Sequence, residues 1–200
     1  DSVLTAAGPT GKPEPEAART ALRARYRYWV LRVADWDLAQ PDAVEALPAV
    51  AAALADLAGA ALEAALVLAR AVSTFPTEDV ARTRLAIIGM GKAGARELNY
   101  ISDGDVIYVA EGADGLENGR AVEIATRLAA ETARGIGEPG IEPPLWEVDA
   151  NLRPEGKDGA LVRTLESHVA YYERWAKSWE FQALLKSRPL AGDAELGERY

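Results

Sequence analysis

A short apolar run that passes directly into a glycine-rich turn is the first feature of this sequence that could support chemistry. Residues 85–88 are followed by Gly89, Gly91 and Gly94, and Lys92 lies between the last two glycines. Glycines permit a tight turn and a close approach of the backbone to a ligand, and the start of a following helix attracts anions. Lys92 adds a positive charge where phosphate oxygens would lie. The segment fits a phosphate-binding turn or a turn without a ligand, and it matches neither Walker A nor the Rossmann fingerprint.

Two aspartates precede the next apolar run. Ser102, Asp103, Gly104 and Asp105 lead into residues 106–109. Because side chains alternate along a strand, Asp103 and Asp105 are expected on the same side. Two carboxylates this close repel unless a proton or cation lies between them, and oxygen-only ligands favour Mg²⁺ or Mn²⁺. The alternative is an Asp-Gly turn without a ligand, but the preceding Gly-Lys turn favours a metal-binding pair.

A third carboxylate is expected from a neighbouring strand. Residues 145–149 are typical of a strand in which Glu147 and Asp149 lie on one face. Either side chain could complete the site. Asp149 is preferred, because it ends the strand and is followed by Arg153 and Lys157, whose charges could face a phosphate. Glu147 is then expected to be a structural acid or an acid at the rim of the site.

Two long helices are expected before the glycine-rich turn. Apolar residues recur at three- and four-residue steps from Ala17 towards Pro41, which ends the first helix, and again from Asp42, an N-cap residue, to Val72. Residues 1–16 are rich in proline, glycine and small polar types, which predicts a linker or a frayed start. The short connection between the two helices predicts a helical hairpin.

The remainder of the chain predicts an α+β fold. Short apolar runs indicate strands at residues 85–88, 106–109 and 145–148, with a helix at 116–134, and helical periodicity resumes from residue 161 to about residue 185. We therefore expect a small mixed sheet with flanking helices, preceded by the hairpin and followed by helices. The linker, hairpin, sheet core and C-terminal helical part are expected at residues 1–16, 17–82, 83–158 and 159–200.

The composition excludes several classes of protein. The 200 residues carry 22 Lys and Arg against 31 Asp and Glu, a net charge of −9 that disfavours a nucleic-acid partner. The absence of cysteine and the single histidine exclude a disulfide framework, a thiol nucleophile and a histidine-rich metal site. That histidine, His168, is expected to be a surface residue or a hydrogen-bonded core residue. No apolar run is expected to span a membrane and no signal pattern is present, so a cytoplasmic location is expected.

Three longer runs carry a resemblance to a known family. They are G-M-G-K-A-G-A-R-E-L-N-Y-I-S-D-G-D-V-I-Y-V at 89–109, D-A-N-L-R-P-E-G-K-D-G-A-L-V-R-T-L at 149–165 and Y-Y-E-R-W-A-K-S-W-E-F-Q-A-L-L-K-S-R-P at 171–189. Their order closely resembles the bacterial bifunctional glutamine synthetase adenylyltransferase/adenylyl-removing enzyme, whose much longer chain carries two nucleotidyltransferase domains. The N-Y-x-S-D and V-I-Y runs resemble its amino-terminal, adenylyl-removing half in the actinobacterial form.

The resemblance implies a nucleotidyltransferase-like sheet and assigns roles to individual residues. Asp103 and Asp105 would be the metal pair and Asp149 the third carboxylate. The implied nucleotide- and phosphate-binding residues are Gly89, Gly91, Lys92, Ser102 and Arg153. One position departs from the family pattern, because Gly104 stands where an apolar residue is usual. A glycine there is expected to loosen the metal pair without abolishing it.

The implied reaction is the attack of inorganic phosphate on the adenylyl-tyrosine of glutamine synthetase, which releases ADP and the unmodified enzyme. This is an in-line displacement at phosphorus supported by divalent cations. The same three acids could support the opposite reaction, in which the tyrosine attacks ATP, and only the resemblance favours removal. A third interpretation is a non-catalytic regulatory module that binds a nucleotide or the PII signalling protein.

Overall fold

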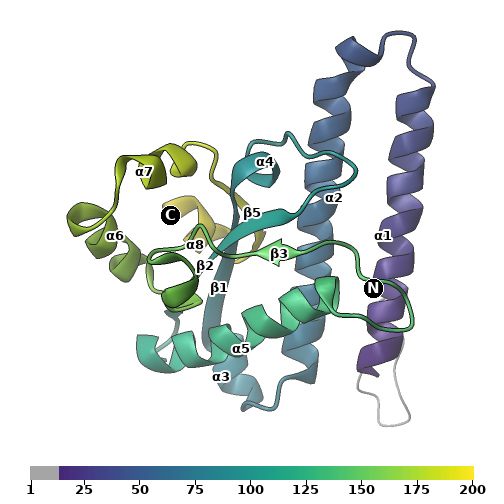
Figure 1. The fold of residues 1–200 in the computed structure, drawn as a ribbon. Coiled ribbons are helices and arrows are strands. Elements are labelled where there is room, and N and C mark those ends of the chain that lie inside the picture. The colour runs from purple at the N-terminus through teal and green to yellow at the C-terminus, as the bar shows by residue number, and fades with distance from the viewer. Residues whose placement is uncertain (1–13) are drawn as a thin grey trace.

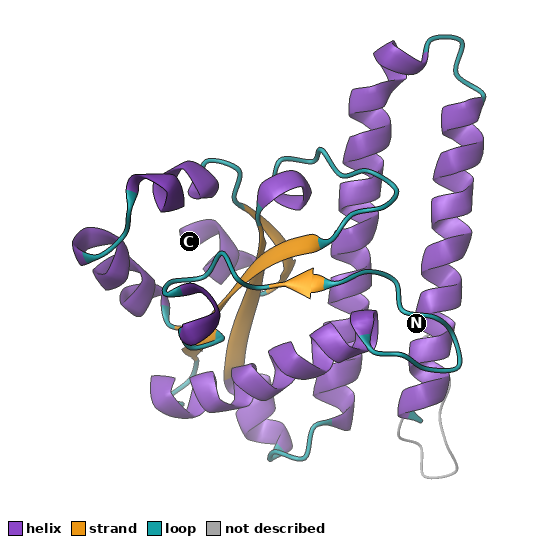
Figure 2. Cartoon of the chain, viewed as in Figure 1, coloured by secondary structure: helices purple, strands orange, loops and turns teal. Residues whose placement is uncertain are grey.

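Two long helices stand beside a small mixed sheet in the computed structural model of the chain, which describes residues 14–200 (Figures 1 and 2). The helices are α1 (Pro15–Leu38), α2 (Ala43–Val72), α3 (Thr77–Arg82), α4 (Gly91–Gly94), α5 (Asn118–Gly137), α6 (Leu165–Arg174), α7 (Ser178–Leu184) and α8 (Ala194–Arg199). The strands are β1 (Thr83–Gly89), β2 (Gly104–Gly112), β3 (Val148–Asp149), β4 (Val162–Arg163) and β5 (Arg188–Gly192). The α+β prediction is confirmed.

The helical hairpin forms as its sequence pattern predicts. Asp42 is the N-cap of α2, and its carboxylate accepts hydrogen bonds from the backbone N–H groups of Val44 at 2.9 Å and Glu45 at 3.0 Å. Leu62 and Leu66 of α2 are buried against the sheet and α5. The hairpin is therefore packed onto the sheet core by the apolar face of its second helix.

Helix α2 is long and apolar enough to cross a membrane by length and composition. Its apolar residues are interrupted by Asp56 and Glu63, so no unbroken apolar run reaches the length of a membrane span. In its most apolar window of 18 residues, 56% of the residues are buried inside the fold, and the helix contacts α1, α5 and β5. Core helices pass the same test, and these contacts account for the apolar composition of α2.

The sheet has the order β3-β2-β1-β5, and β4 also pairs with β2. Strand β1 is antiparallel to β2 and β5, whereas β3 and β4 are parallel to β2. The sheet face towards α2 and α5 carries Leu85, Ile87, Val106 and Tyr108. The opposite face carries Ile88, Ile107 and Val109 under α6, α7 and α8. Since Asp105 precedes Ile107 by two residues, its side chain belongs to this second face.

The region after residue 161 contains the expected helices and, in addition, strands that were not expected. It contains β4, two short helices, β5 and α8, and the strand expected at 145–148 is only the two-residue β3. Strand β5 forms because Arg188–Gly192 pairs with β1, about a hundred residues earlier in the chain. Such pairing depends on distant residues, and local periodicity does not report it.

His168 is a core residue, so the surface position, one of the two expectations, is wrong. The side chain is only 2% exposed, and the backbone carbonyl of Tyr108 lies beside its ring. Neither ring nitrogen has a partner in hydrogen-bonding geometry within residues 14–200. Burial, reinforced by the charge of Arg163, lowers the pKa of His168 to about 4. The ring is therefore neutral at physiological pH.

This neutral histidine predicts a loss of stability on mild acidification. Between pH 7 and pH 5 the unfolded chain protonates His168, whose ordinary pKa is 6.5, while the folded chain does not until about pH 4. The free energy of unfolding should fall by about 2 kcal/mol from this group alone. Urea unfolding of the wild type and His168→Gln at both pH values measures it. An identical pH dependence in the two proteins would contradict the prediction.

Candidate functional site

Asp105 and Asp149 are direct partners in neighbouring parallel strands. In the register of β2 and β3, Gly104 lies opposite Val148 and Asp105 opposite Asp149. Partner residues of adjacent strands project to the same face, with the strands about 4.8 Å apart. Asp103 immediately precedes β2, two residues before Asp105. The structure thus brings the three predicted acids together at one end of the sheet.

The three carboxylates act on one another electrostatically. Partial burial raises the pKa of Asp105, the negative charges of Asp103 and Asp149 raise it further, and the charge of Lys92 lowers it. A cation between the carboxylates would relieve this repulsion, and their oxygen atoms are the donors that Mg²⁺ and Mn²⁺ prefer. The donor chemistry therefore fits a divalent cation.

The carboxylates are not gathered into a complete metal-binding cluster. Within residues 14–200, no group of three acidic or histidine side chains lies close enough to hold a metal ion as it stands. Asp149 accepts a hydrogen bond from the N–H of Asn151 at 2.7 Å, and Asp103 accepts one from the hydroxyl of Ser102 at 3.3 Å. Shared coordination of an ion would require side-chain rotation away from these local partners.

The glycine-rich turn lies directly against Asp105. The N–H of Met90 donates to the carbonyl of Asp105 at 2.9 Å. Gly91 has a φ of +51°, and a Cβ at this position would lie 2.5 Å from Oδ2 of Asp105. Glycine is thus required both by the backbone conformation and by the closeness of the carboxylate. The helix expected after the turn is only the single turn α4, shorter than predicted.

The other residues predicted for the turn take separate positions around it. Gly89 ends β1 and pairs with Val106, while Lys92 is exposed and its ammonium group lies 3.3 Å from Oδ1 of Asn99. Sequence reasoning missed Arg188, whose guanidinium donates to the carbonyls of Ala93 and Gly94, each at 3.2 Å. Arg188 therefore fixes α4 from β5, a contact for which the local sequence carries no signal.

Arg153 is engaged with the loop that follows Asp149. Its guanidinium donates to the carbonyls of Ala150 at 2.8 Å, Lys157 at 3.0 Å and Gly159 at 3.1 Å. These contacts close the loop. In this arrangement Arg153 supports the backbone next to Asp149, and direct phosphate binding by its guanidinium stays a prediction.

The packing around position 104 explains why a glycine stands there. A Cβ at this position would lie 2.7 Å from Cζ3 of Trp146, so the indole ring fills the space that a side chain at position 104 would take. Trp146 in turn packs against the core on the α2 and α5 side of the sheet. Trp146 thereby compensates for the packing that was expected to be lost at Gly104.

This pairing predicts the outcome of restoring an apolar residue. Gly104→Val should lower the free energy of unfolding by about 1–3 kcal/mol, because the new side chain would overlap the Trp146 ring. Trp146→Leu in the same chain should recover part of that loss. Thermal unfolding of both single variants and the double variant measures the coupling. If the two substitutions change the free energy of unfolding in a strictly additive way, the conclusion that Trp146 occupies the space of a side chain at position 104 is wrong.

Helix α1 fixes the segment that leads to Asp149. Arg23 is only 2% exposed, and it donates five hydrogen bonds to the backbone carbonyls of Arg134, Gly135, Glu138 and Glu142. The guanidinium of Arg27 donates further hydrogen bonds to the carboxylate of Glu142 and to the carbonyls of Pro143 and Pro144. The carbonyls at the end of α5 are thereby satisfied by side chains of the hairpin. The same contacts set the course of the chain into β3.

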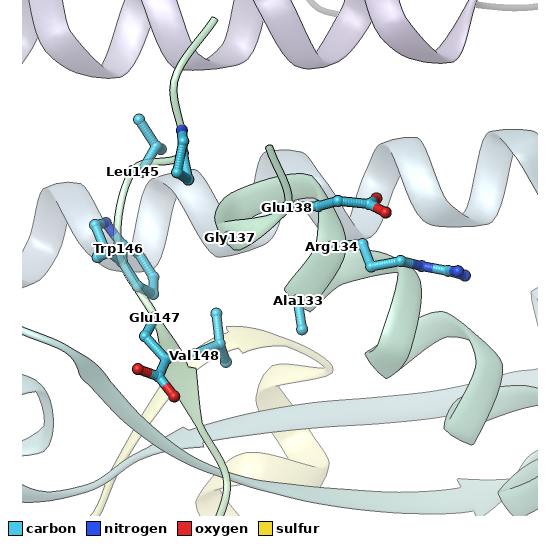
Figure 3. A pocket seen from close by; sticks show the side chains of 9 residues that line it. Ala133, Arg134, Gly137, Glu138, Leu145, Trp146, Glu147 and Val148 are labelled. Carbon is cyan, nitrogen blue, oxygen red and sulfur yellow. The ribbon is translucent and has the colours of Figure 1, made fainter. Parts of the chain in front are cut away.

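A cavity of about 580 Å³ lies between the end of α5 and the segment before β3, and Figure 3 shows its lining. Trp146 and Val148 form part of this lining, whereas the side chains of Arg134 and Glu138 point away from Trp146 (Figure 3). Asp103, Asp105 and Asp149 do not line it. The predicted acids therefore occupy the sheet face and not this cavity.

Comparison with known proteins identifies the family. The family model described as glutamate-ammonia ligase adenylyltransferase (GlnE) matches residues 5–200. A protein of Leifsonia xyli is 61% identical over the whole chain, and proteins of Streptomyces avermitilis and Mycobacterium bovis are 55% and 53% identical over 90% of it. All three are called bifunctional glutamine synthetase adenylyltransferase/adenylyl-removing enzymes, and the chain covers 21%, 17% and 17% of their lengths. The chain, about a fifth as long as these relatives, belongs to the glutamate-ammonia ligase adenylyltransferase family.

Proposed function

We propose that this chain carries the adenylyl-removing activity of a cytoplasmic nucleotidyltransferase that regulates glutamine synthetase in nitrogen metabolism. Inorganic phosphate attacks the phosphorus of the adenylyl-tyrosine, the bond between that phosphorus and the tyrosine oxygen breaks, and ADP and free tyrosine are released. The observation that carries the proposal is the register of Asp105 opposite Asp149, with Asp103 beside them and the Gly91 turn against Asp105. The N-Y-x-S-D motif at residues 99–103 resembles the adenylyl-removing half of the family and therefore favours removal of the adenylyl group over its addition.

The residues of the site have distinct tasks in this reaction. Asp103, Asp105 and Asp149 would hold Mg²⁺ or Mn²⁺, which when bound stabilises charge on the entering and leaving oxygens. Phosphate is already an oxyanion at neutral pH, so no residue has to act as a strong base. Lys92, whose charge acts on Asp105, is placed to attract the phosphate. The protein therefore contributes mainly positioning and charge.

A direct assay separates the two directions of adenylyl transfer. The chain is incubated with Mg²⁺, inorganic phosphate and adenylylated glutamine synthetase, and ADP is measured. A parallel reaction contains unmodified glutamine synthetase and ATP, and pyrophosphate is measured. We expect ADP in the first reaction and no pyrophosphate in the second. Pyrophosphate without ADP would assign the opposite activity, and neither product from a folded chain would favour the non-catalytic interpretation.

A further inference from the structure

A second cavity lies on the same face of the sheet as Asp105. It has a volume of about 710 Å³ and is formed by α6, α7 and the C-terminal residue Tyr200. Its lining residues Leu165, Leu184 and Tyr200 pack against the core cluster that contains Ile107 and Val109. Because these two residues alternate along β2 with Asp105, the cavity and the carboxylate share one face. The distance along β2 from Asp105 is about 7 Å to Ile107 and about 13 Å to Val109.

Two buried polar groups line this cavity without hydrogen-bond partners. His168 is only 2% exposed, and both of its ring nitrogens lack a partner within the described part of the chain, residues 14–200. Over the same residues the hydroxyl of Tyr200 has no partner in hydrogen-bonding geometry, although the hydroxyl of Tyr172 lies close to it. Unsatisfied buried polar groups are unfavourable and rare in folded proteins. A ligand that offers both donors and acceptors would satisfy them.

The remaining lining is suited to a flat, uncharged ring. Tyr172 is nearly parallel to His168, with an interplanar angle of 17°, and its ring centroid lies 5.7 Å from that of Phe181. Aromatic walls of this kind accept a planar ligand by stacking or edge contact. The volume also lies within the usual range of small-molecule sites. The cavity therefore combines aromatic walls with a few polar groups.

We propose that this cavity binds the adenine ring of the nucleotide while its phosphate groups reach the carboxylates. The assignment rests on the proposed function and names the base subsite of the same site. The edge of a purine carries both donors and acceptors, which match the neutral His168 and the Tyr200 hydroxyl, and Glu173 at the rim can accept from its amino group. A tyrosine ring of the substrate protein offers only one hydroxyl and would leave these groups unsatisfied.

The single histidine makes the test specific. Labelling with ¹⁵N-histidine gives the ring nitrogens of one residue, His168, and adenosine is titrated into the intact chain. Adenosine lacks phosphate, so its binding does not require the carboxylates. We expect a saturable shift of the His168 signals with adenosine and none with uridine, and the same shift in Asp105→Asn. Failure of adenosine to move the signals would overturn the proposal, as would a larger effect of N-acetyltyrosinamide.

A matched pair of variants on α7 adds a second measure. Phe181 lines the cavity and is 48% exposed, whereas Trp179 is 52% exposed and does not line it. Phe181→Leu should weaken adenosine binding roughly tenfold, the effect of losing one aromatic contact with a base, and Trp179→Leu should leave it unchanged. Equal effects of the two substitutions would contradict the subsite. ADP formation without adenosine binding would reject the subsite alone, and adenosine binding without ADP formation would reject phosphorolysis alone.

Discussion

Asp105→Asn is expected to lower kcat for phosphorolysis of adenylylated glutamine synthetase by about 10³-fold, or about 4 kcal/mol of transition-state stabilisation. Asp105 is the acid that lies between the other two, opposite Asp149 and two residues from Asp103. The amide removes a negative oxygen that a divalent cation needs, while its size leaves the contact with the Gly91 turn in place. Steady-state ADP release measures the effect.

Glu147→Gln is the matched control for this prediction. Glu147 is an exposed acid two residues before Asp149, and its backbone carbonyl, which the substitution preserves, accepts the N–H of Gly104 at 2.9 Å. We expect activity within about twofold of the wild type, because surface charges contribute little. Equal losses in the two variants would mean that the general negative charge of this edge, and not the Asp105 position, is required.

Arg23→Met should produce a large loss of stability through the hairpin. It removes five hydrogen bonds and takes these donors from the carbonyls of Gly135, Glu138 and Glu142, whereas the carbonyl of Arg134 keeps the N–H of Glu138. The expected decrease in the free energy of unfolding is about 3–4 kcal/mol, and the midpoint of thermal unfolding should fall by roughly 10 °C. Methionine keeps most of the apolar volume, so the measurement reports mainly the lost hydrogen bonds.

Arg25→Met controls for the removal of a positive charge from the same helix. Arg25 is exposed, and its guanidinium carbon lies 5.2 Å from the ring centroid of Tyr28 and 5.4 Å from that of Trp29. We expect a change of less than about 1 kcal/mol. Differential scanning calorimetry of both variants decides the matter, and similar midpoints would show that the carbonyl contacts of Arg23 contribute little.

Features with a local cause could be predicted from the sequence. Asp42 caps α2 through its own carboxylate, and the alternation of side chains placed Asp105 on a defined face. A tight turn at Gly91 was predicted because this glycine follows a strand, and the positive φ of Gly91 agrees with that prediction. The pairing of Asp105 with Asp149 followed from the expectation that a neighbouring strand supplies the third acid.

Features that depend on distant residues could not be predicted. Strand β5 exists through its pairing with β1, and Arg188 reaches α4 from that strand. The ring of Trp146 fills the space beside Gly104, although the two positions are 42 residues apart. Taken alone, Gly104 therefore indicated a loosened metal pair. In the sequence, Arg23 looks like an ordinary solvent-exposed charge on a helix. The residues next to it do not indicate that its guanidinium binds the carbonyls of Gly135 and Glu138.

The contacts of Arg23 and Arg27 set a lower limit on the size of an independently working fragment. A truncated protein that starts at β1 would retain the three acids and the glycine-rich turn. It would lose both arginines, so the chain between α5 and β3 would keep only its contacts with α5 and β2, and Asp149 would be held less firmly opposite Asp105. The antiparallel helices are therefore part of the smallest unit that can keep the third acid in place.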